Sequence, residues 1–158
     1  MRRLVMPRRP YVSTYFSPDR GAADIVIGFI DHTTTTLDVA VYSLTHPRIA
    51  KAVQDAHERG VAVRVLTDKV QASSKYSMAG ALDEAGLSVR LDHQAGSMHN
   101  KFAVSDAALP SRAVALGSFN WTKSADERNA ESLVIVRLRA VVQACQDEFG
   151  RLWVANAP

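Results

Sequence analysis

The pattern of apolar positions divides the chain into short apolar runs, which predict strands, and amphipathic stretches, which predict helices. Residues 61–66 form a near-continuous apolar run, as is typical of a strand covered on both faces in a parallel sheet. Residues 22–32 instead repeat apolar side chains at helical spacing, with Val26 and Ile30 on one face. The other predicted strands are 11–16, 37–43, 87–91, 99–104, 112–116 and 131–137, and the other predicted helices are 47–59, 76–85 and 140–154.

This alternation of strands and helices predicts an α/β sandwich. We expect a mixed, largely parallel sheet sandwiched between helices. The chain has 158 residues, the length of a single domain. Residues 1–10 carry four Arg and two Pro and are expected to form a loose basic tail, which leaves residues 11–158 as the folded domain.

The composition is that of an ordinary globular protein, with 47% hydrophobic and 22% charged residues. A net charge of +3 is compatible with a polyanionic partner but does not require one. The single cysteine, Cys145, cannot form a disulfide within the chain and is expected to be a buried small apolar residue. No Cys/His cluster resembles a zinc site, and no apolar run reaches the length of a membrane span.

The basic start of the chain lacks the apolar core of a signal peptide. For the chain as it stands, this favours a cytoplasmic location. A periplasmic or secreted location is the alternative if a signal sequence has been removed.

The strongest chemical signal is the pattern His-x-Lys-x4-Asp, formed by His99, Lys101 and Asp106. Side chains alternate along a strand, so His99 and Lys101 are expected to point the same way. A lysine neutralises an anionic substrate, and a histidine beside it serves as nucleophile or proton carrier. Asp106 falls at or past the strand end and is expected to brace the strand. Taken alone, such a triplet usually has no catalytic meaning.

Two later stretches strengthen the catalytic interpretation. Gly117-Ser118-Phe119-Asn120 follows one predicted strand, and Glu131 begins the next. Taken singly, Ser118 and Asn120 are ordinary turn formers and Glu131 is a solvated residue at a strand start. The ordered set of three stretches is much more specific than any one of them.

This set resembles the signature of the phospholipase D superfamily, in which H-x-K-x4-D is followed by G-S-x-N and then by a glutamate. The resemblance extends from about Tyr15 to about Val136 and is strongest to the small bacterial endonucleases with a single copy of the motif. It implies a phospholipase D-like fold and covalent catalysis, in which His99 attacks phosphorus to form a phosphohistidine.

The resemblance also suggests roles for the other motif residues. Glu131 would hold the second imidazole nitrogen of His99 as a donor. Lys101 and Asn120 would hold the non-bridging oxygens, assisted by Ser118. Because these residues replace a cation, we expect neither a metal nor another cofactor. Asp68 is the one other acidic residue worth attention, and it more readily caps the following loop.

The motif occurs once, which suggests a homodimer. In-line attack requires an acid on the far side of phosphorus, and the chain offers one suitable histidine. In a two-fold dimer, His99 of one subunit would attack and His99 of the other would protonate the leaving group. Resembling family members are homodimers of this kind, and the hypothesis predicts an inactive monomer.

Substrate contacts are expected from loops past the strand ends. Lys69, Lys75 and Lys123 are candidates for phosphate contacts, with ordinary surface lysines as the alternative. Trp121 could stack on a base, or pack in the core or at a dimer seam. Tyr42 ends a strand and could line the cleft. No sequence-reading module is visible, so we expect little sequence preference.

Three functions remain open from the sequence. The first is a metal-independent endonuclease acting on DNA, with RNA as a further substrate. The second is a phospholipase cutting lipid headgroups, which requires an apolar membrane-facing loop or an anchor helix. Neither is visible, so no stable membrane association is expected. The third is a non-catalytic nucleic-acid-binding domain, against which the intact motif set argues.

Overall fold

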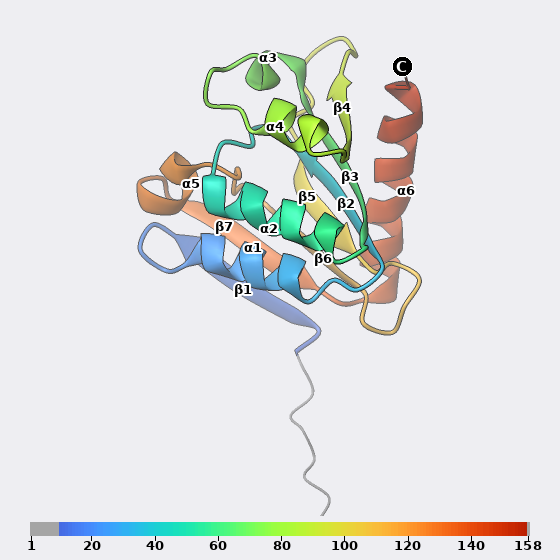
Figure 1. Cartoon of the computed structure of the whole chain (residues 1–158). Coiled ribbons are helices and arrows are strands. Elements are labelled where there is room, and N and C mark those ends of the chain that lie inside the picture. Colours follow the sequence, from blue (N-terminus) through green and yellow to red (C-terminus); the bar gives the residue numbers. More distant parts are fainter. Residues whose placement is uncertain (1–9, 158) are drawn as a thin grey trace, which may run out of the picture.

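The computed structural model describes residues 10–157, so the predicted basic tail lies outside the described residues except for Pro10. Seven strands form one sheet in the order β1-β7-β6-β5-β2-β3-β4 (Figure 1). The strands are β1 (Val12–Ser17), β2 (Thr36–Val41), β3 (Ala62–Asp68), β4 (Ser88–Asp92), β5 (Lys101–Ser105), β6 (Ala113–Gly117) and β7 (Glu131–Val136). The helices are α1 (Ala22–Asp31), α2 (Pro47–Glu58), α3 (Lys69–Ala72), α4 (Ala79–Glu84), α5 (Lys123–Glu127) and α6 (Arg139–Ala155).

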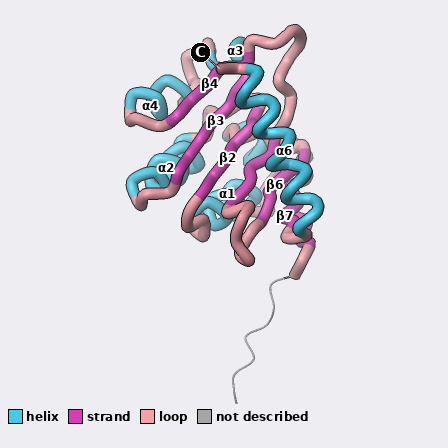
Figure 2. The backbone as a smooth tube through the Cα atoms, turned by 90° about the vertical axis from the view of Figure 1, so that its right-hand side faces the viewer, coloured by secondary structure: helices cyan, strands magenta, loops and turns pink. Residues whose placement is uncertain are grey.

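Helices cover both faces of the sheet, as Figure 2 shows. On one face α1 and α2 pack side by side, and residues such as Val26, Val39 and Val53 fill the larger apolar core. On the other face α6 lies across β2, β5 and β6, and Phe149 anchors it in a smaller core. The predicted α/β sandwich is therefore confirmed.

The prediction of a largely parallel sheet is wrong. Among the described strands only β2–β3 and β3–β4 pair in parallel, whereas β1–β7, β6–β7, β5–β6 and β2–β5 are antiparallel. No helix separates β4 from β5 or β5 from β6. A parallel neighbour needs a long crossover connection, so the short connection from β5 reverses the chain into the antiparallel β6.

The sequence patterns did not predict two of the short helices, α3 and α5. None of the predicted helices includes residues 69–72 or 123–127, but α3 and α5 lie there. Each starts at a side-chain cap. Asp68 accepts hydrogen bonds from the amides of Val70 and Gln71, at 2.9 and 3.0 Å, and Thr122 accepts one from Ala125 at 3.1 Å.

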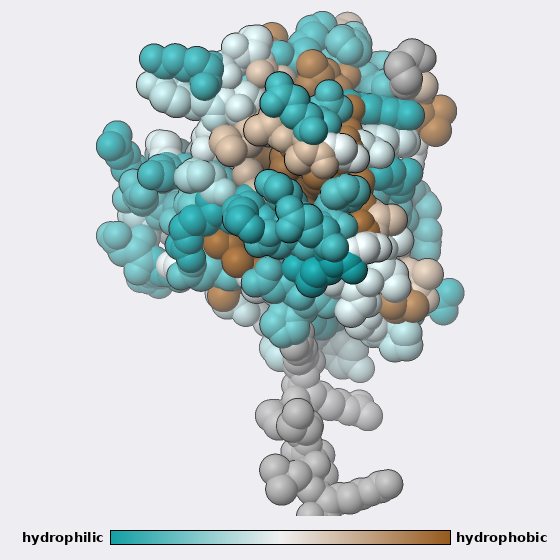
Figure 3. Space-filling model, in the orientation of Figure 1, coloured by the Kyte–Doolittle hydropathy of each residue, from teal (hydrophilic) through white to brown (hydrophobic). Residues whose placement is uncertain are grey.

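This topology brings the motif residues other than Asp106 to the same end of the strands, and we call this end of the sheet the site edge. The carboxyl ends of β2 and β6 lie there beside the amino ends of β5 and β7, because these strands alternate in direction. Over α1 and α2 the surface is mainly hydrophilic (Figure 3). Among the helices of residues 10–157, none has the length and apolar character needed to cross a bilayer.

Candidate active site

His99 and Lys101 meet at the ring of Tyr42. The ring centroids of Tyr42 and His99 lie 4.6 Å apart, and the Lys101 ammonium lies 5.1 Å from the centre of the same tyrosine ring. The expected strand over 99–104 begins two residues late, at Lys101, so His99 lies in the preceding segment and is exposed. The expected proximity of the two side chains still results, because Tyr42 follows directly from β2 and pairs with Asn100 through its amide.

Partial burial affects the pKa of Lys101. Burial lowers the pKa of its ammonium group below the usual value, and the nearby carboxylate of Glu131 partly opposes this shift. The ammonium also donates a hydrogen bond of 2.7 Å to the carbonyl oxygen of His99. A cation with little water around it attracts an anion more strongly than a fully hydrated one.

Glu131 and Ser118 form the second half of the site edge. The Ser118 hydroxyl donates to Oε2 of Glu131 at 2.5 Å and accepts from the Ser132 amide at 3.0 Å. Asn129 donates to the other oxygen of Glu131 at 3.2 Å. Within residues 10–157 the Glu131 carboxylate accepts these bonds and none from His99, whose ring lies against Tyr42. The expected hydrogen bond between Glu131 and His99 is thus not made in this structure.

Gly117 explains why the G-S-x-N stretch begins with glycine. Its φ of +155° is rarely adopted by residues with a side chain, and a Cβ atom there would lie 2.1 Å from the carbonyl oxygen of Ser132. That backbone oxygen cannot move away without breaking the sheet. The close approach of β6 to β7 at this point sets Ser118 against the Ser132 amide.

Asn120 lies in a segment that hydrogen bonds hold against the residues after β2. The Trp121 carbonyl accepts hydrogen bonds of 2.9 Å from the amides of Thr45 and His46. Trp121 itself is only 2% exposed and belongs to the larger core, so its expected stacking on a base is wrong and the core alternative holds. β6 ends at Gly117, so Ser118 and Asn120 both lie in the segment that follows the strand. Within the described chain, Oδ1 of Asn120 is buried without a hydrogen-bond partner, which is uncommon away from functional sites.

His46 and Gln71 belong to this surrounding layer, and the sequence did not single them out as site residues. Gln71 donates a hydrogen bond of 3.0 Å to the Tyr42 hydroxyl. His46 is buried, and its Nε2 atom lies 3.7 Å from Asp126. Burial lowers the pKa of His46, opposed by the charge of Asp126 and assisted by those of Arg48 and Lys123. In the sequence His46 only precedes the predicted helix over 47–59, and Gln71 carried no signal.

Asp106 lies at the opposite end of β5 from Lys101. Its carboxylate accepts hydrogen bonds from the amides of Thr34, Thr35 and Thr36, at 3.0, 2.7 and 3.1 Å, and from the hydroxyls of Thr34 and Thr35, both at 2.9 Å. Burial alone would raise the pKa of Asp106, but these hydrogen bonds together lower it. The motif groups Asp106 with the catalytic residues, yet its contacts are those of the expected brace.

Asp68 also has a structural role. Besides capping α3, it accepts a hydrogen bond of 3.3 Å from the Met98 amide and so ties α3 to the residue before His99. The expectation that it caps the following segment is confirmed. Within residues 10–157 no group of three or more His, Cys, Asp or Glu side chains is arranged to hold a metal ion.

The lysines expected to grip substrate are all exposed. Lys69 begins α3, Lys75 follows it on the next loop, and Lys123 begins α5. Their contact with a substrate stays a prediction. Cys145 is half-buried against the smaller core, and burial raises the pKa of its thiol.

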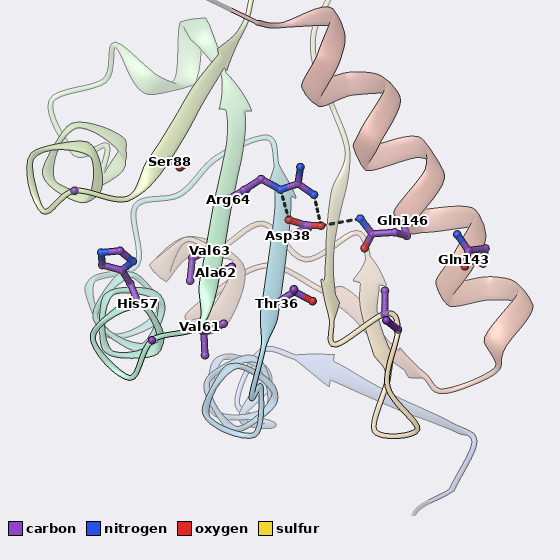
Figure 4. A pocket seen from close by; sticks show the side chains of 14 residues that line it. Thr36, Asp38, His57, Val61, Ala62, Val63, Arg64, Ser88, Gln143 and Gln146 are labelled. Carbon is purple, nitrogen blue, oxygen red and sulfur yellow. Dashed lines mark hydrogen bonds and ion pairs between the residues drawn. The ribbon is translucent and has the colours of Figure 1, made fainter.

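A hollow at the other end of the sheet contains none of the predicted site residues (Figure 4). Two hydrogen bonds of 2.7 Å join Arg64 to the buried carboxylate of Asp38, which also accepts one of 2.7 Å from Gln146. The guanidinium group is therefore neutralised by its own neighbour. The chemistry of the motifs lies at the site edge instead.

Comparisons with known proteins identify relatives of the whole domain. The family model described as "Cardiolipin synthase, PLD-like domain" matches residues 26–153. The mitochondrial cardiolipin hydrolase of Xenopus tropicalis is 42% identical over 123 residues, which cover 78% of this chain and 57% of the relative. A phospholipase D of Rickettsia prowazekii is 33% identical over 150 residues, which cover 94% of this chain and 71% of the relative. The chain spans about half the length of the cardiolipin hydrolases it matches.

Solved structures show the same fold. Nuc from Salmonella typhimurium, a phospholipase D family member, superposes with a TM-score of 0.85 at 28% identity, covering 94% of this chain and 97% of Nuc. NucT from Helicobacter pylori has a TM-score of 0.79 at 24% identity, covering 92% and 98%, and supports the fold alone. With the family model matching most of its length, the chain belongs to the phospholipase D superfamily.

Proposed function

We propose that this protein is a phosphodiesterase that cleaves DNA, with RNA as a further substrate and with little sequence preference. The observation that carries this proposal is the meeting of His99 and Lys101 at the Tyr42 ring. It places an exposed imidazole beside a partly dehydrated ammonium group, which suits an attack on a phosphodiester anion.

The proposed reaction has two steps. In the first, an imidazole nitrogen of His99 bonds to phosphorus while the bond from phosphorus to the leaving oxygen breaks, and an acid on the far side gives that oxygen a proton. In the second, the deprotonated acid takes a proton from water as that water attacks phosphorus, and the phosphorus–nitrogen bond breaks, which returns free His99 and the original acid. Lys101 and Asn120 stabilise the charge on the non-bridging oxygens in both steps, with Ser118 beside them.

A second candidate is hydrolysis of phospholipids by the same chemistry. It is favoured by the relatives named mitochondrial cardiolipin hydrolase and phospholipase D. Nucleic acid is the stronger candidate because the segments around His99 are basic and lack acidic residues. The stretches 69–78 and 93–101 contain no Asp or Glu. A third candidate, a non-catalytic nucleic-acid-binding domain, has no use for the intact motif set.

The direct test compares the two substrate classes. The wild-type protein is incubated in excess EDTA with supercoiled plasmid, with single-stranded DNA and with vesicles containing cardiolipin. We expect cleavage of both DNA substrates and no release of phosphatidic acid from the vesicles. Hydrolysis of the lipid without cleavage of DNA would replace the nuclease proposal with the second candidate. Loss of all cleavage in EDTA would contradict the metal-independent mechanism.

The proposal includes a homodimer that shares one active site. The single motif supports it, because the second acid must come from another copy of His99. The exposed ring of Phe16 also supports it. This ring is 47% accessible on β1, and Phe16 pairs in register with Ser132 beside the site edge.

Subunit mixing tests the shared site. Wild-type protein and the His99→Ala variant are mixed in equal amounts and allowed to exchange subunits. If both histidines are needed, only pairs of wild-type subunits work, and activity falls to about one quarter of that of wild type at the same total concentration. Independent subunits would instead retain about one half. Sedimentation of the same samples establishes whether the protein is dimeric at all.

A further inference from the structure

The segment 69–76 exposes an unusual group of side chains. Tyr76 is 66% exposed and Val70 is 64% exposed, although both are large apolar residues. Lys69 and Lys75 are exposed beside them. Apolar and aromatic side chains gathered on a surface commonly mark an interaction site.

These side chains make few contacts within the described fold. The Lys75 ammonium lies 4.9 Å from the centre of the Tyr76 ring, and no ion pair within residues 10–157 involves Lys69 or Lys75. Because the stretch 69–78 contains no acidic residue, it carries two uncompensated positive charges. The ring of Tyr76 and both ammonium groups are therefore available to a ligand.

This group lies beside the proposed active site. Gln71, in the middle of the segment, donates a hydrogen bond to the Tyr42 hydroxyl, and Tyr42 contacts His99. Asp68 holds both α3 and the Met98 amide. In Figure 1 α3 and the loop between α3 and α4 lie at the top of the view, and Figure 3 shows hydrophilic side chains protruding at its upper left.

The charges around His99 favour a polyanion on this side. The acidic residues at the ends of β3 and β4, Asp68 and Asp92, are 2% and 3% exposed, and each is hydrogen-bonded. The loop 93–98 has no acidic side chain. The stretch 123–131, which runs from α5 to the start of β7, instead carries three acidic and two basic side chains. A phosphodiester chain that extends from His99 is therefore attracted towards the positive charges of the segment 69–76.

We propose that Tyr76, flanked by Lys69 and Lys75, binds the single-stranded flank of a nucleic acid whose phosphodiester group lies at His99. This inference rests on the proposed function, since it takes the substrate to be a nucleic acid. An exposed tyrosine ring stacks on an unpaired base, and lysines beside it contact the phosphates. Bases paired in a duplex cannot stack in this way, so the site gives a preference for single strands.

The test measures binding to a fluorescein-labelled oligothymidylate by anisotropy, in the His99→Ala background so that the probe is not consumed. We expect Tyr76→Ala to raise the Kd about tenfold and Tyr76→Phe to leave it nearly unchanged. Lys75→Ala is expected to reduce the slope of log K against log salt by about one. For a duplex of equal length, the effect of Tyr76→Ala is expected to stay below about twofold.

Two matched controls lie far from the segment in sequence. Tyr11→Ala removes another exposed tyrosine, 61% accessible, and Lys51→Ala removes an exposed lysine on α2. Neither should change oligonucleotide binding. The proposal is overturned if Tyr76→Ala behaves like Tyr11→Ala, or if the oligonucleotide does not bind at all. It is also overturned if Tyr76→Ala weakens binding to anionic phospholipid vesicles but not to the oligonucleotide.

These outcomes separate the binding site from the catalytic proposal. Binding that depends on Tyr76 without any cleavage by the wild type would keep the binding site and reject the nuclease function. Cleavage of DNA with no effect of Tyr76→Ala would do the opposite.

Discussion

The His99→Ala variant is expected to lose at least about 10³-fold in kcat for DNA cleavage, with little change in the affinity for DNA. Alanine cannot form the bond to phosphorus, so the covalent route is closed rather than slowed. Binding depends on the surrounding cations, which the substitution leaves in place. Cleavage of supercoiled plasmid measures the first quantity, and anisotropy with a labelled oligonucleotide measures the second.

The fold of this variant should be unchanged, because His99 is exposed and precedes β5. His93→Ala is a matched control. His93 is also exposed on the connection from β4 to β5, and its backbone amide donates a hydrogen bond of 2.8 Å to the side chain of Asn156. This variant should cleave DNA at the wild-type rate. Cleavage by His99→Ala close to that rate would remove His99 as the nucleophile.

The Asp106→Ala variant is expected to lose about 3–5 kcal/mol of unfolding free energy. The substitution leaves the amides of Thr34, Thr35 and Thr36 without their acceptor, and Asp106 is only 1% exposed. Its φ of +50° adds to the cost, since alanine adopts that conformation less readily than aspartate. Urea denaturation followed by circular dichroism measures the loss.

The pH dependence identifies the charge as the cause. The pKa of Asp106 is lower in the folded chain than in the unfolded one, so its stabilisation is fully present above the unfolded pKa, about 3.9. The stabilisation is lost as the pH falls through the folded pKa. The stability difference between wild type and Asp106→Asn should therefore narrow below about pH 4.

Two further variants test the specificity of this effect. Asp83→Ala, at an exposed position on α4, should change the stability by less than about 0.5 kcal/mol. Asp106→Asn should keep its activity per folded molecule. Equal stability of wild type and Asp106→Ala at pH 7 would contradict the bracing role.

Much of this architecture could be predicted from the sequence. The helix over 22–32 and the closing helix over 140–154 were found within a residue or so, because both carry apolar side chains at helical spacing. All seven strands were found, with their ends within two residues. Strand direction was found for 61–66, which forms the parallel strand β3, but β5 and β6 are also apolar and buried although they pair antiparallel. The antiparallel half of the sheet is decided by connections such as the tight one between β5 and β6.

The candidate site shows the same limit. Order along the chain identified His99, Lys101, Ser118 and Glu131, and the structure places them at one edge. Sequence order could not show that Glu131 bonds to Ser118 rather than to His99. It also could not show that Trp121 turns into the core, because that depends on the hydrogen bonds between its carbonyl and the segment after β2.

The two ends of β5 carry the two roles proposed for the motif, which are substrate contact at Lys101 and bracing at Asp106. Lys101 begins the strand and Asp106 follows its last residue, about 16 Å away at the usual rise of an extended chain. Residues that far apart, without shared partners, contribute to free energies independently. Substitutions among Thr34, Thr35 and Thr36, which bind Asp106, can thus raise or lower the stability without changing turnover. In an engineered or evolving form of this protein, activity and stability can therefore be changed separately within the six residues 101–106.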